Sequence, residues 1–266
     1  MSDSDYGAYD READHAFPDE RLHAILDRIA DDDEVQALLA AQNVNPVTRL
    51  GFNDHGPKHV EIVTDRALSL YDLLKRADVP FSGAADHGLA AADEAVIIGL
   101  AATLHDVGHI VHRTDHAHWS VPLAADILDR ILPSFYGTAE CVCIKAETLH
   151  AIVCHHADSV PLTEEAGVMR VADGLDMERG RSRAPYESGG RGINTVSSRA
   201  IEHVRLFAGE QVPVRVEIEM TSAAGVYQVD TLLKRKLEGS GLEDYIRIVA
   251  VNVGSGSDPI VERIEL

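Results

Sequence analysis

Histidine and aspartate residues, whose side chains bind divalent metal ions, recur near the ends of apolar stretches in this chain. In AATLHDVGHIVHR (101–113), an apolar helical pattern runs into the adjacent pair His105 and Asp106, and His109 follows about one helical turn after His105. Adjacent residues on a helix point about 100° apart, so His105 and Asp106 can hold one ion only as neighbours on the rim of a site. Other segments must therefore supply the remaining ligands. The chain offers His59, His116, His118, His155, His156 and Asp173.

The types of ligand indicate which ions can bind. Carboxylate and imidazole groups without a thiolate favour Mn, Ni, Fe, Co, Zn or Mg over a structural zinc site. The three cysteines, Cys141, Cys143 and Cys154, form no disulfide framework, and we expect buried thiols in a reducing cytoplasm.

Apolar residues at helical spacing predict a bundle that positions these side chains. The segment 92–106 is apolar nearly all round, which is typical of a central helix, and Gly108 is expected to end it and to present His109 from an irregular segment. Pro57 fits the first turn of a helix that carries His59. The predicted helices are 22–29, 33–41, 57–77, 92–106, 116–132, 139–154, 163–177 and 194–208.

The hydrophobic period changes near residue 212. VPVRVEIEM (212–220) alternates apolar and charged residues, as a half-buried strand does, and further strands are predicted at 245–253 and 260–266 around a helix at 229–237. We therefore expect a mainly α fold, a helical bundle followed by a small α+β domain that serves in assembly or as a lid. The expected parts are an acidic tail over 1–17, the bundle over 18–210 and the α+β domain over 211–266.

The composition excludes two classes of partner. With 44 acidic against 24 basic residues, the net charge of −20 repels nucleic acid and anionic membranes. No stretch approaches the roughly 18 apolar residues of a membrane helix, and the acidic, polar start of the chain does not resemble a signal peptide, so we expect a cytoplasmic protein. An Asp-rich, Lys-poor surface also favours a salt-loving source, because high salt screens the self-repulsion.

Arginine and glycine are concentrated in RGRSRAPYESGGRG (179–192), although the protein as a whole is acidic. Guanidinium groups bind phosphate oxygens through two hydrogen bonds at once, so this loop can receive an anion. Arg181 and Arg183, together with Lys58, are the candidate phosphate contacts. A solvated linker is the alternative interpretation of the same loop.

The ordered set of ligands resembles the HD superfamily of metal-dependent phosphohydrolases, an all-helical fold named for its His-Asp doublet. His59 matches the first His, His105 and Asp106 in LHDVGH match the doublet, and Asp173 in VADGLD matches the final Asp. The elements DHGPKH and GRSR and the C-terminal pattern also resemble an uncharacterised archaeal branch, for which the acidic surface favours a haloarchaeal member. A Gly-Tyr-Pro motif does not follow the His pair, so the cyclic-dinucleotide subclass is not expected.

The resemblance implies one or two divalent ions. The first would be held by His59, His105, Asp106 and Asp173. Members of the family with a second metal take further ligands from segments like DHAHWS and VCHHAD, here His118, His155 and His156, with His116 as a substitute for His118.

Such a centre implies hydrolysis of a nucleotide-like phosphate mono- or diester by a metal-activated hydroxide. Asp106 would bridge the two ions. His109 is the candidate general acid or base, or an outer partner of a ligand, and Asp176 is expected to be a helix cap or an outer partner. The expected partner is a small phosphorylated substrate, and the expected assembly is a homo-oligomer, a dimer.

Two other classes of function fit the same residues. A regulatory module could bind a metal or a nucleotide without turnover. A di-iron oxygenase could use His and carboxylate ligands on the same fold, although the arginine-rich loop fits a phosphate better. A purely stabilising metal set is less expected, because it would gather many ligands with no open position.

Overall fold

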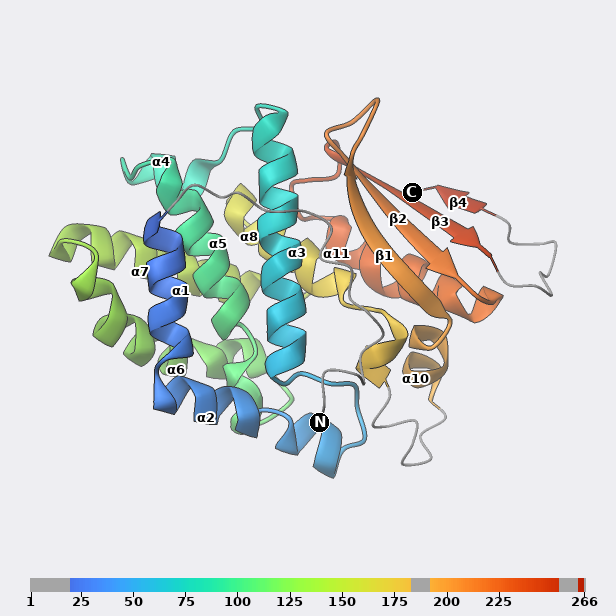
Figure 1. Cartoon of the computed structure of the whole chain (residues 1–266), viewed down its shortest axis with the longest axis horizontal. Helices are drawn as coiled ribbons and strands as arrows, with labels where there is room; N and C mark the ends of the chain where they lie inside the picture. The colour runs from blue at the N-terminus through green and yellow to red at the C-terminus, as the bar shows by residue number, and fades with distance from the viewer. Residues whose placement is uncertain (1–19, 183–191, 254–262, 266) are drawn as a thin grey trace.

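The computed structural model describes residues 20–182, 192–253 and 263–265. Figure 1 shows helices gathered on one side of the molecule and a sheet on the other, with the long helix α3 (Pro57–Arg76) between them. This arrangement confirms the expected fold class, a mainly α chain with a small α+β region at its C-terminal end. The expected acidic tail lies outside the described residues.

The helices of the bundle begin and end close to the predicted positions. Pro57 occupies the first turn of α3, as its fixed φ angle favours, and the Thr163 side chain accepts a hydrogen bond from the Ala166 amide at the start of α8. The short helix α4 (Ser82–Asp86) lies between the predicted helices 57–77 and 92–106, where no helix was predicted. Besides α3, the bundle contains α1 (Glu20–Ala30), α2 (Asp33–Ala41), α4 (Ser82–Asp86), α5 (Ala92–Leu104), α6 (His116–Ile131), α7 (Thr138–Cys154) and α8 (Glu164–Leu175).

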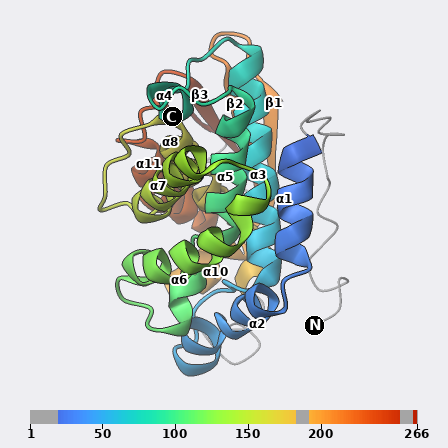
Figure 2. The ribbon, with the colours of Figure 1, turned by 90° about the vertical axis from the view of Figure 1, so that its left-hand side faces the viewer.

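Helix α5 is the centre of the bundle, as predicted. Every residue from Asp93 to Leu104 is buried, because α5 packs against α1, α3, α7 and α8. Figure 2 shows α1, α3 and α5 running alongside one another. Fully buried side chains such as Ile97 and Leu100 each stabilise the fold by about 1.5–3 kcal/mol. This packing fixes the C-terminal end of α5, where His105 and Asp106 follow.

The sheet has four strands in the order β1 (Ile201–Ala208), β2 (Val214–Met220), β3 (Ile246–Asn252) and β4 (Arg263–Glu265). β1 pairs antiparallel with β2, and β3 pairs antiparallel with β4, whereas β2 and β3 are parallel. A parallel pair requires a crossover, which the predicted helical segment supplies as the π-helix η7 (Tyr227–Leu233) and the short helix α11 (Lys234–Leu237).

One hydrophobic core joins the sheet to the bundle. The residues of β2 alternate between buried and half-buried, with Val214, Val216, Ile218 and Met220 inward, which confirms the predicted period of two. These side chains belong to the same core cluster as α5, and α8 packs against η7 and α11. The crossover therefore lies directly beside the helix that carries Asp173.

The predicted helix over 194–208 is wrong. A six-residue helix, α10 (Ile193–Ser198), is followed by strand β1, so the sheet begins before the expected domain boundary at 211. The buried residues Ile201 and Val204 are three apart, which resembles a helical period. The register of β1 against β2 shifts between Ile201 and His203, and this irregularity turns residues three apart toward the same face of a strand.

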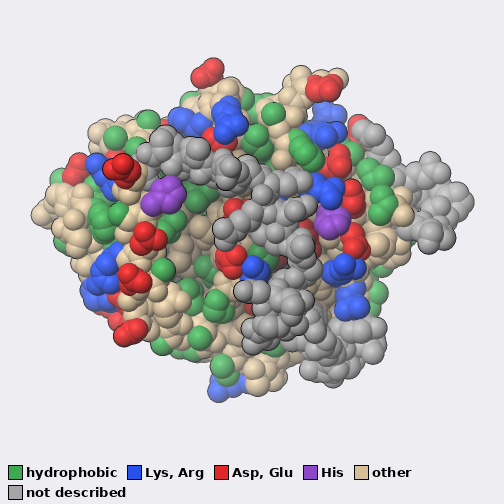
Figure 3. Space-filling view, in the orientation of Figure 1, with side chains coloured by type: hydrophobic (Ala, Val, Ile, Leu, Met, Phe, Trp, Pro, Cys, Tyr) green, Lys and Arg blue, Asp and Glu red, His purple; other side chains and the backbone are tan. Residues whose placement is uncertain are grey.

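Acidic and basic side chains are interspersed over the face shown in Figure 3, rather than gathered in blocks of one sign. Within the part of the chain that the structure describes, no helix combines the length and the apolar character needed to cross a bilayer.

We predict that Asp32 stabilises the fold by capping α2. Its Oδ1 accepts hydrogen bonds from the amides of Glu34 and Val35 at 3.1 Å, and its Oδ2 lies 2.7 Å from Arg130 Nη1. Asp32→Ala should lower the free energy of unfolding by about 0.5–2 kcal/mol in urea denaturation. Because the Arg130 guanidinium lowers the pKa of Asp32, this stabilisation should persist above the ordinary carboxyl range and disappear as the pH falls toward the folded-state pKa.

The control for Asp32 is its neighbour Asp33, which is exposed in the first turn of the same helix. Asp33→Ala should change the free energy of unfolding by no more than about 0.5 kcal/mol. Equal losses in the two variants would contradict the capping role.

Candidate metal centre

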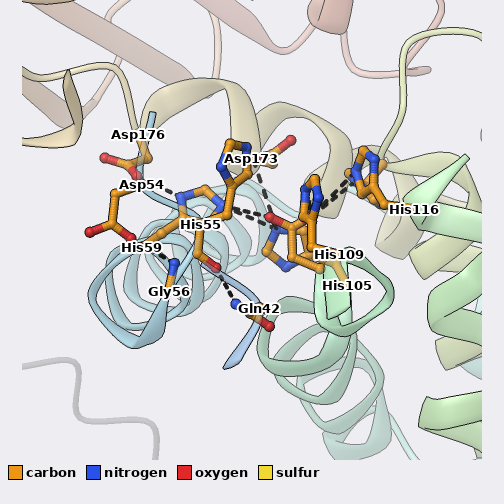
Figure 4. Close-up of polar contacts among 12 residues, drawn as sticks. Gln42, Asp54, His55, Gly56, His59, His105, His109, His116, Asp173 and Asp176 are labelled. Carbon is orange, nitrogen blue, oxygen red and sulfur yellow. Dashed lines mark hydrogen bonds and ion pairs between the residues drawn. The ribbon is translucent and has the colours of Figure 1, made fainter. Parts of the chain in front are cut away.

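Side chains from six segments of the bundle lie around the buried carboxylate of Asp106, which is 2% exposed. Figure 4 shows the side chains of His59, His105, His109, His116 and Asp173 gathered in one cluster. They come from the first turn of α3, the residue after α5, the 3-10 helix η3 (Val107–Ile110), the start of α6 and the last turn of α8. His155, the residue after α7, completes the cluster.

The two oxygens of Asp106 face two groups of ligands. Oδ2 lies 3.4 Å from Nε2 of both His59 and His105, and Asp173 Oδ1 lies 3.4 Å from the same nitrogen of His59. Oδ1 lies 3.3 Å from His116 Nε2 and 3.7 Å from His155 Nε2. Atoms about 2.1 Å from one ion are about 3.0–3.4 Å apart at octahedral or tetrahedral angles, so these separations suit ligands around an ion.

The outer nitrogen of each of four histidines has a partner that turns its inner nitrogen toward the centre. His105 Nδ1 donates to the Ala102 carbonyl at 2.8 Å, and His155 Nδ1 donates to the Ile152 carbonyl at 2.6 Å. His116 uses the Arg113 carbonyl in the same way, and His59 Nδ1 lies 2.6 Å from Asp176 Oδ2. With Nδ1 carrying the proton, Nε2 presents its lone pair, which is the tautomer that a metal ligand needs. Asp176 has the outer-partner position expected of it.

The electrostatics of the cluster favour a bound cation. Burial opposes ionisation of Asp106 and Asp173, but neighbouring histidines hold the pKa of Asp106 well below its ordinary range, and Lys236 together with His59 and His105 does the same for Asp173. Burial and Arg181 oppose protonation of His59, yet the surrounding carboxylates raise its pKa to about 10. Without a metal ion, a proton on His59 thus supplies positive charge among the carboxylates.

Several polar atoms in the cluster have no hydrogen-bond partner among the described residues. Asp106 Oδ2 and both ring nitrogens of His109 are buried without a hydrogen bond. Each buried unsatisfied group costs about 1–3 kcal/mol. Burial also lowers the pKa of His109 to about 3, so its imidazole is neutral and can donate a nitrogen lone pair to a metal ion. The described residues contain three sets that can hold an ion: His55, Asp106 and His109; His59, His105 and Asp173; and His105, Asp106 and His155.

Two of the expected second-metal ligands lie away from the cluster. His118 is exposed, whereas His116 lies against Asp106. Residues two positions apart on a helix point about 200° away from each other, so only one of these two histidines can face the centre. His156 is also exposed, 3.3 Å from Asp158, at the mouth of the site. The structure thus brings His116 and His155 to the centre and leaves His118 and His156 outside it.

The three expected phosphate contacts have different positions. Arg181 lies in the wall of the site, where it donates to the Asp176 carbonyl and approaches Asp173. Lys58 pairs with Glu61 one turn along α3 and is not part of that wall. Arg183 lies outside the described residues.

Two residues of the site were missed from the sequence. The ring of His55 lies 4.6 Å from that of His109, and only its nearness to His59 in DHGPKH could have indicated it. Lys236 of α11 pairs with Asp173 and donates to the His155 carbonyl at 3.1 Å. No local pattern predicts this contact, because it joins segments 63 residues apart through the crossover of the sheet.

Gly108 has a different role from the expected one. Helix α5 ends at Leu104, and Gly108 lies inside η3, where a Cβ atom would overlap the His116 carbonyl oxygen and the Ser120 amide. The Gly108 amide donates to Ser120 Oγ at 2.8 Å, and this hydroxyl donates to the His105 carbonyl at 2.6 Å. Glycine therefore allows the turn after Asp106 to lie directly on α6.

Comparison with known proteins agrees with this geometry. The family described as HD domain matches residues 81–178, which include the doublet and Asp173 but not His59. The chain belongs to the HD superfamily, whose helical domains bind divalent metals. It is 36% identical over 226 residues to the uncharacterized protein MJ1020 of Methanocaldococcus jannaschii, covering 85% of this chain and 87% of that protein. The organism of this relative is consistent with the expected archaeal source.

We predict that Gly108→Ala disrupts the metal centre. The added methyl group must push η3 away from α6, which separates Asp106 from His116. The free energy of unfolding should fall by about 1–3 kcal/mol, and the metal retained per chain after loading and dialysis should decrease. Elemental analysis and urea denaturation measure the two effects.

Gly137→Ala is the matched control, since its added methyl group would meet only Glu140 Oε2 at 3.4 Å, an ordinary contact. This variant should retain the metal content of the wild-type protein. If Gly108→Ala also did so, the turn would not be what positions the centre.

Proposed function

We propose that this HD protein is a metal-dependent phosphohydrolase that cleaves a nucleotide-like phosphate mono- or diester. The observation that carries the proposal is a cavity of about 340 Å³ in which the metal cluster and basic side chains share one wall. The protein has a net charge of −20, yet basic residues gather beside the acidic metal cluster. This arrangement favours binding of an anion that would also contact the metal ions. The basic residues are Arg113, Arg181, Arg235 and Lys236.

In this proposal the first ion would be held by His59, His105, Asp106 and Asp173. The second would be held by Asp106 with His116 and His155; the Nε2 atoms of these two histidines are 3.0 Å apart. His116 takes the place expected of His118, and His156 is left at the mouth of the site.

Divalent ions in these positions would supply an activated water and neutralise the charge on the phosphoryl oxygens. The protein would contribute orientation and charge. The Asp176 carboxylate holds His59 in the required tautomer. Arg181 in turn donates a hydrogen bond to the backbone carbonyl of Asp176 and so fixes its position. Lys236 holds Asp173 from the side of the sheet. His109 is neutral and buried, so a ring nitrogen can donate its lone pair to a metal ion, whereas the pKa that burial lowers to about 3 makes it a weak base.

We predict that Asp106→Ala loses both ions and hydrolysis together, because its two oxygens face both groups of ligands. Release of p-nitrophenol from its phosphate mono- and diester, with Mn or Ni present, should fall by more than about a hundredfold. Elemental analysis of the loaded protein gives the metal content. Activity retained in Asp106→Ala would refute the proposal.

His116→Ala and His118→Ala form a matched pair, since both lie in the first turn of α6 but only His116 reaches Asp106. His116→Ala should lose the second ion, and His118→Ala should retain it. The reverse result would restore His118 as the ligand.

The same preparation separates the alternative functions. Nucleotide binding without turnover across a metal panel would favour a regulatory module. Oxygen consumption after anaerobic loading with iron would favour an oxygenase.

A further inference from the structure

A second cavity, of about 540 Å³, adjoins the cavity at the metal centre. It is formed largely by the segment between η3 and α6, residues 112–118, together with Leu50 and Ser159. The walls of the two cavities have in common Phe52, Arg113, His116, His156 and Asp158. The proposed reaction at the ions involves only the phosphoryl group, so the second cavity is available to the rest of a larger substrate.

Arg113 lies at the junction of the two cavities. Its guanidinium carbon is 3.9 Å from the centre of the Phe52 ring, and the side chain is half-buried. Stacking on an aromatic ring holds a guanidinium group in place while its N–H donors remain free in the plane of the group.

The Arg113 guanidinium has neither a hydrogen bond nor a carboxylate partner among the described residues, in contrast to Arg181, which approaches two carboxylates. Burial lowers the pKa of Arg113 even though the charge of Asp106 opposes this shift, which reflects the cost of removing this cation from water. An anion at the junction would offset that cost.

The acidic residues of the second cavity leave room for an anion beside Arg113. The Asp158 carboxylate is exposed and lies 4.0 Å from Arg235, so solvent screens its charge and one guanidinium group partly neutralises it. Asp115, the other acidic residue of this wall, is exposed to solvent, which screens its charge.

We propose that Arg113, held against Phe52, binds a second anionic group of the substrate, whose remainder occupies the second cavity. The substrate class is then a phosphorylated compound with an additional phosphate or carboxylate close to the reacting phosphate. This inference rests on the proposed function for its reacting phosphate, but the anion site itself requires no turnover.

The test compares three ligands of the metal-loaded full chain by isothermal titration calorimetry. Inorganic phosphate carries one anionic group, methylenediphosphonate adds a second phosphonate, and phosphonoacetate adds a carboxylate. The wild-type protein should bind one of the two larger ligands at least about tenfold more tightly than phosphate, as one charge-assisted hydrogen-bonded pair allows. The larger ligand that binds more tightly than phosphate identifies the second anionic group as a phosphate or a carboxylate.

Arg113→Gln should abolish this gain, so that its affinity for the larger ligand falls by a much larger factor than its affinity for phosphate. Phe52→Leu should reduce the gain, because Arg113 keeps its charge but loses the ring that positions it. Arg215→Gln is the matched control, since Arg215 also stacks on a phenylalanine, Phe207, at 5.1 Å, but lies in the sheet away from both cavities. Unchanged metal content and thermal melting would show that each variant folds.

Two results would overturn the inference: no preference of the wild-type protein for either larger ligand, or an equal loss for all three ligands in Arg113→Gln. A preference that depends on Arg113 in a protein that hydrolyses no phosphoester would contradict the proposed function and leave the anion site standing. Hydrolysis of a phosphoester without this preference would support the proposed function and contradict the anion site at Arg113.

Discussion

The structure depends on one buried carboxylate, that of Asp106, with histidine nitrogens facing both of its oxygens. An isolated carboxylate is costly to bury, and histidines alone compensate for it only when protonated. Metal ions between these atoms would satisfy the carboxylate and the lone pairs at once. The apolar packing of α5 fixes the position of Asp106, and the surrounding helix ends supply the other ligands at the same depth. The packing of the bundle therefore fixes the position of Asp106 and of the side chains around it.

The C-terminal region contributes to the site as well as to the core. The crossover between β2 and β3 lies beside α8, and it brings Lys236 to Asp173 and Arg235 to the mouth of the cavity. An assembly or lid role remains a prediction for this region, as does a dimer, but part of the cavity wall comes from it. The overall charge of −20 is no obstacle to an anionic substrate, because nearby groups dominate the local potential.

Sequence patterns predicted the secondary structure well where the hydrophobic pattern of a segment continued without interruption. The apolar run of α5 and the alternation of β2 leave no other arrangement that buries their side chains. The segment 201–208 was predicted wrongly, because the irregular pairing near Ile201 turns residues three apart to one face. Such an irregularity is set by the partner strand, so the strand's own sequence cannot show it.

The sequence by itself determined the chemistry of the site. His59, the doublet at 105–106 and Asp173 stand in an order that indicated a His and carboxylate centre before any fold was known. Tertiary structure decided which further residues reach it. Helix phase separates His116 from His118, contacts distant in sequence bring in His55 and Lys236, and the position of Phe52 decides where the Arg113 guanidinium lies. The physical reason is that ligand type is a property of a residue, whereas the direction of a side chain depends on what its element packs against.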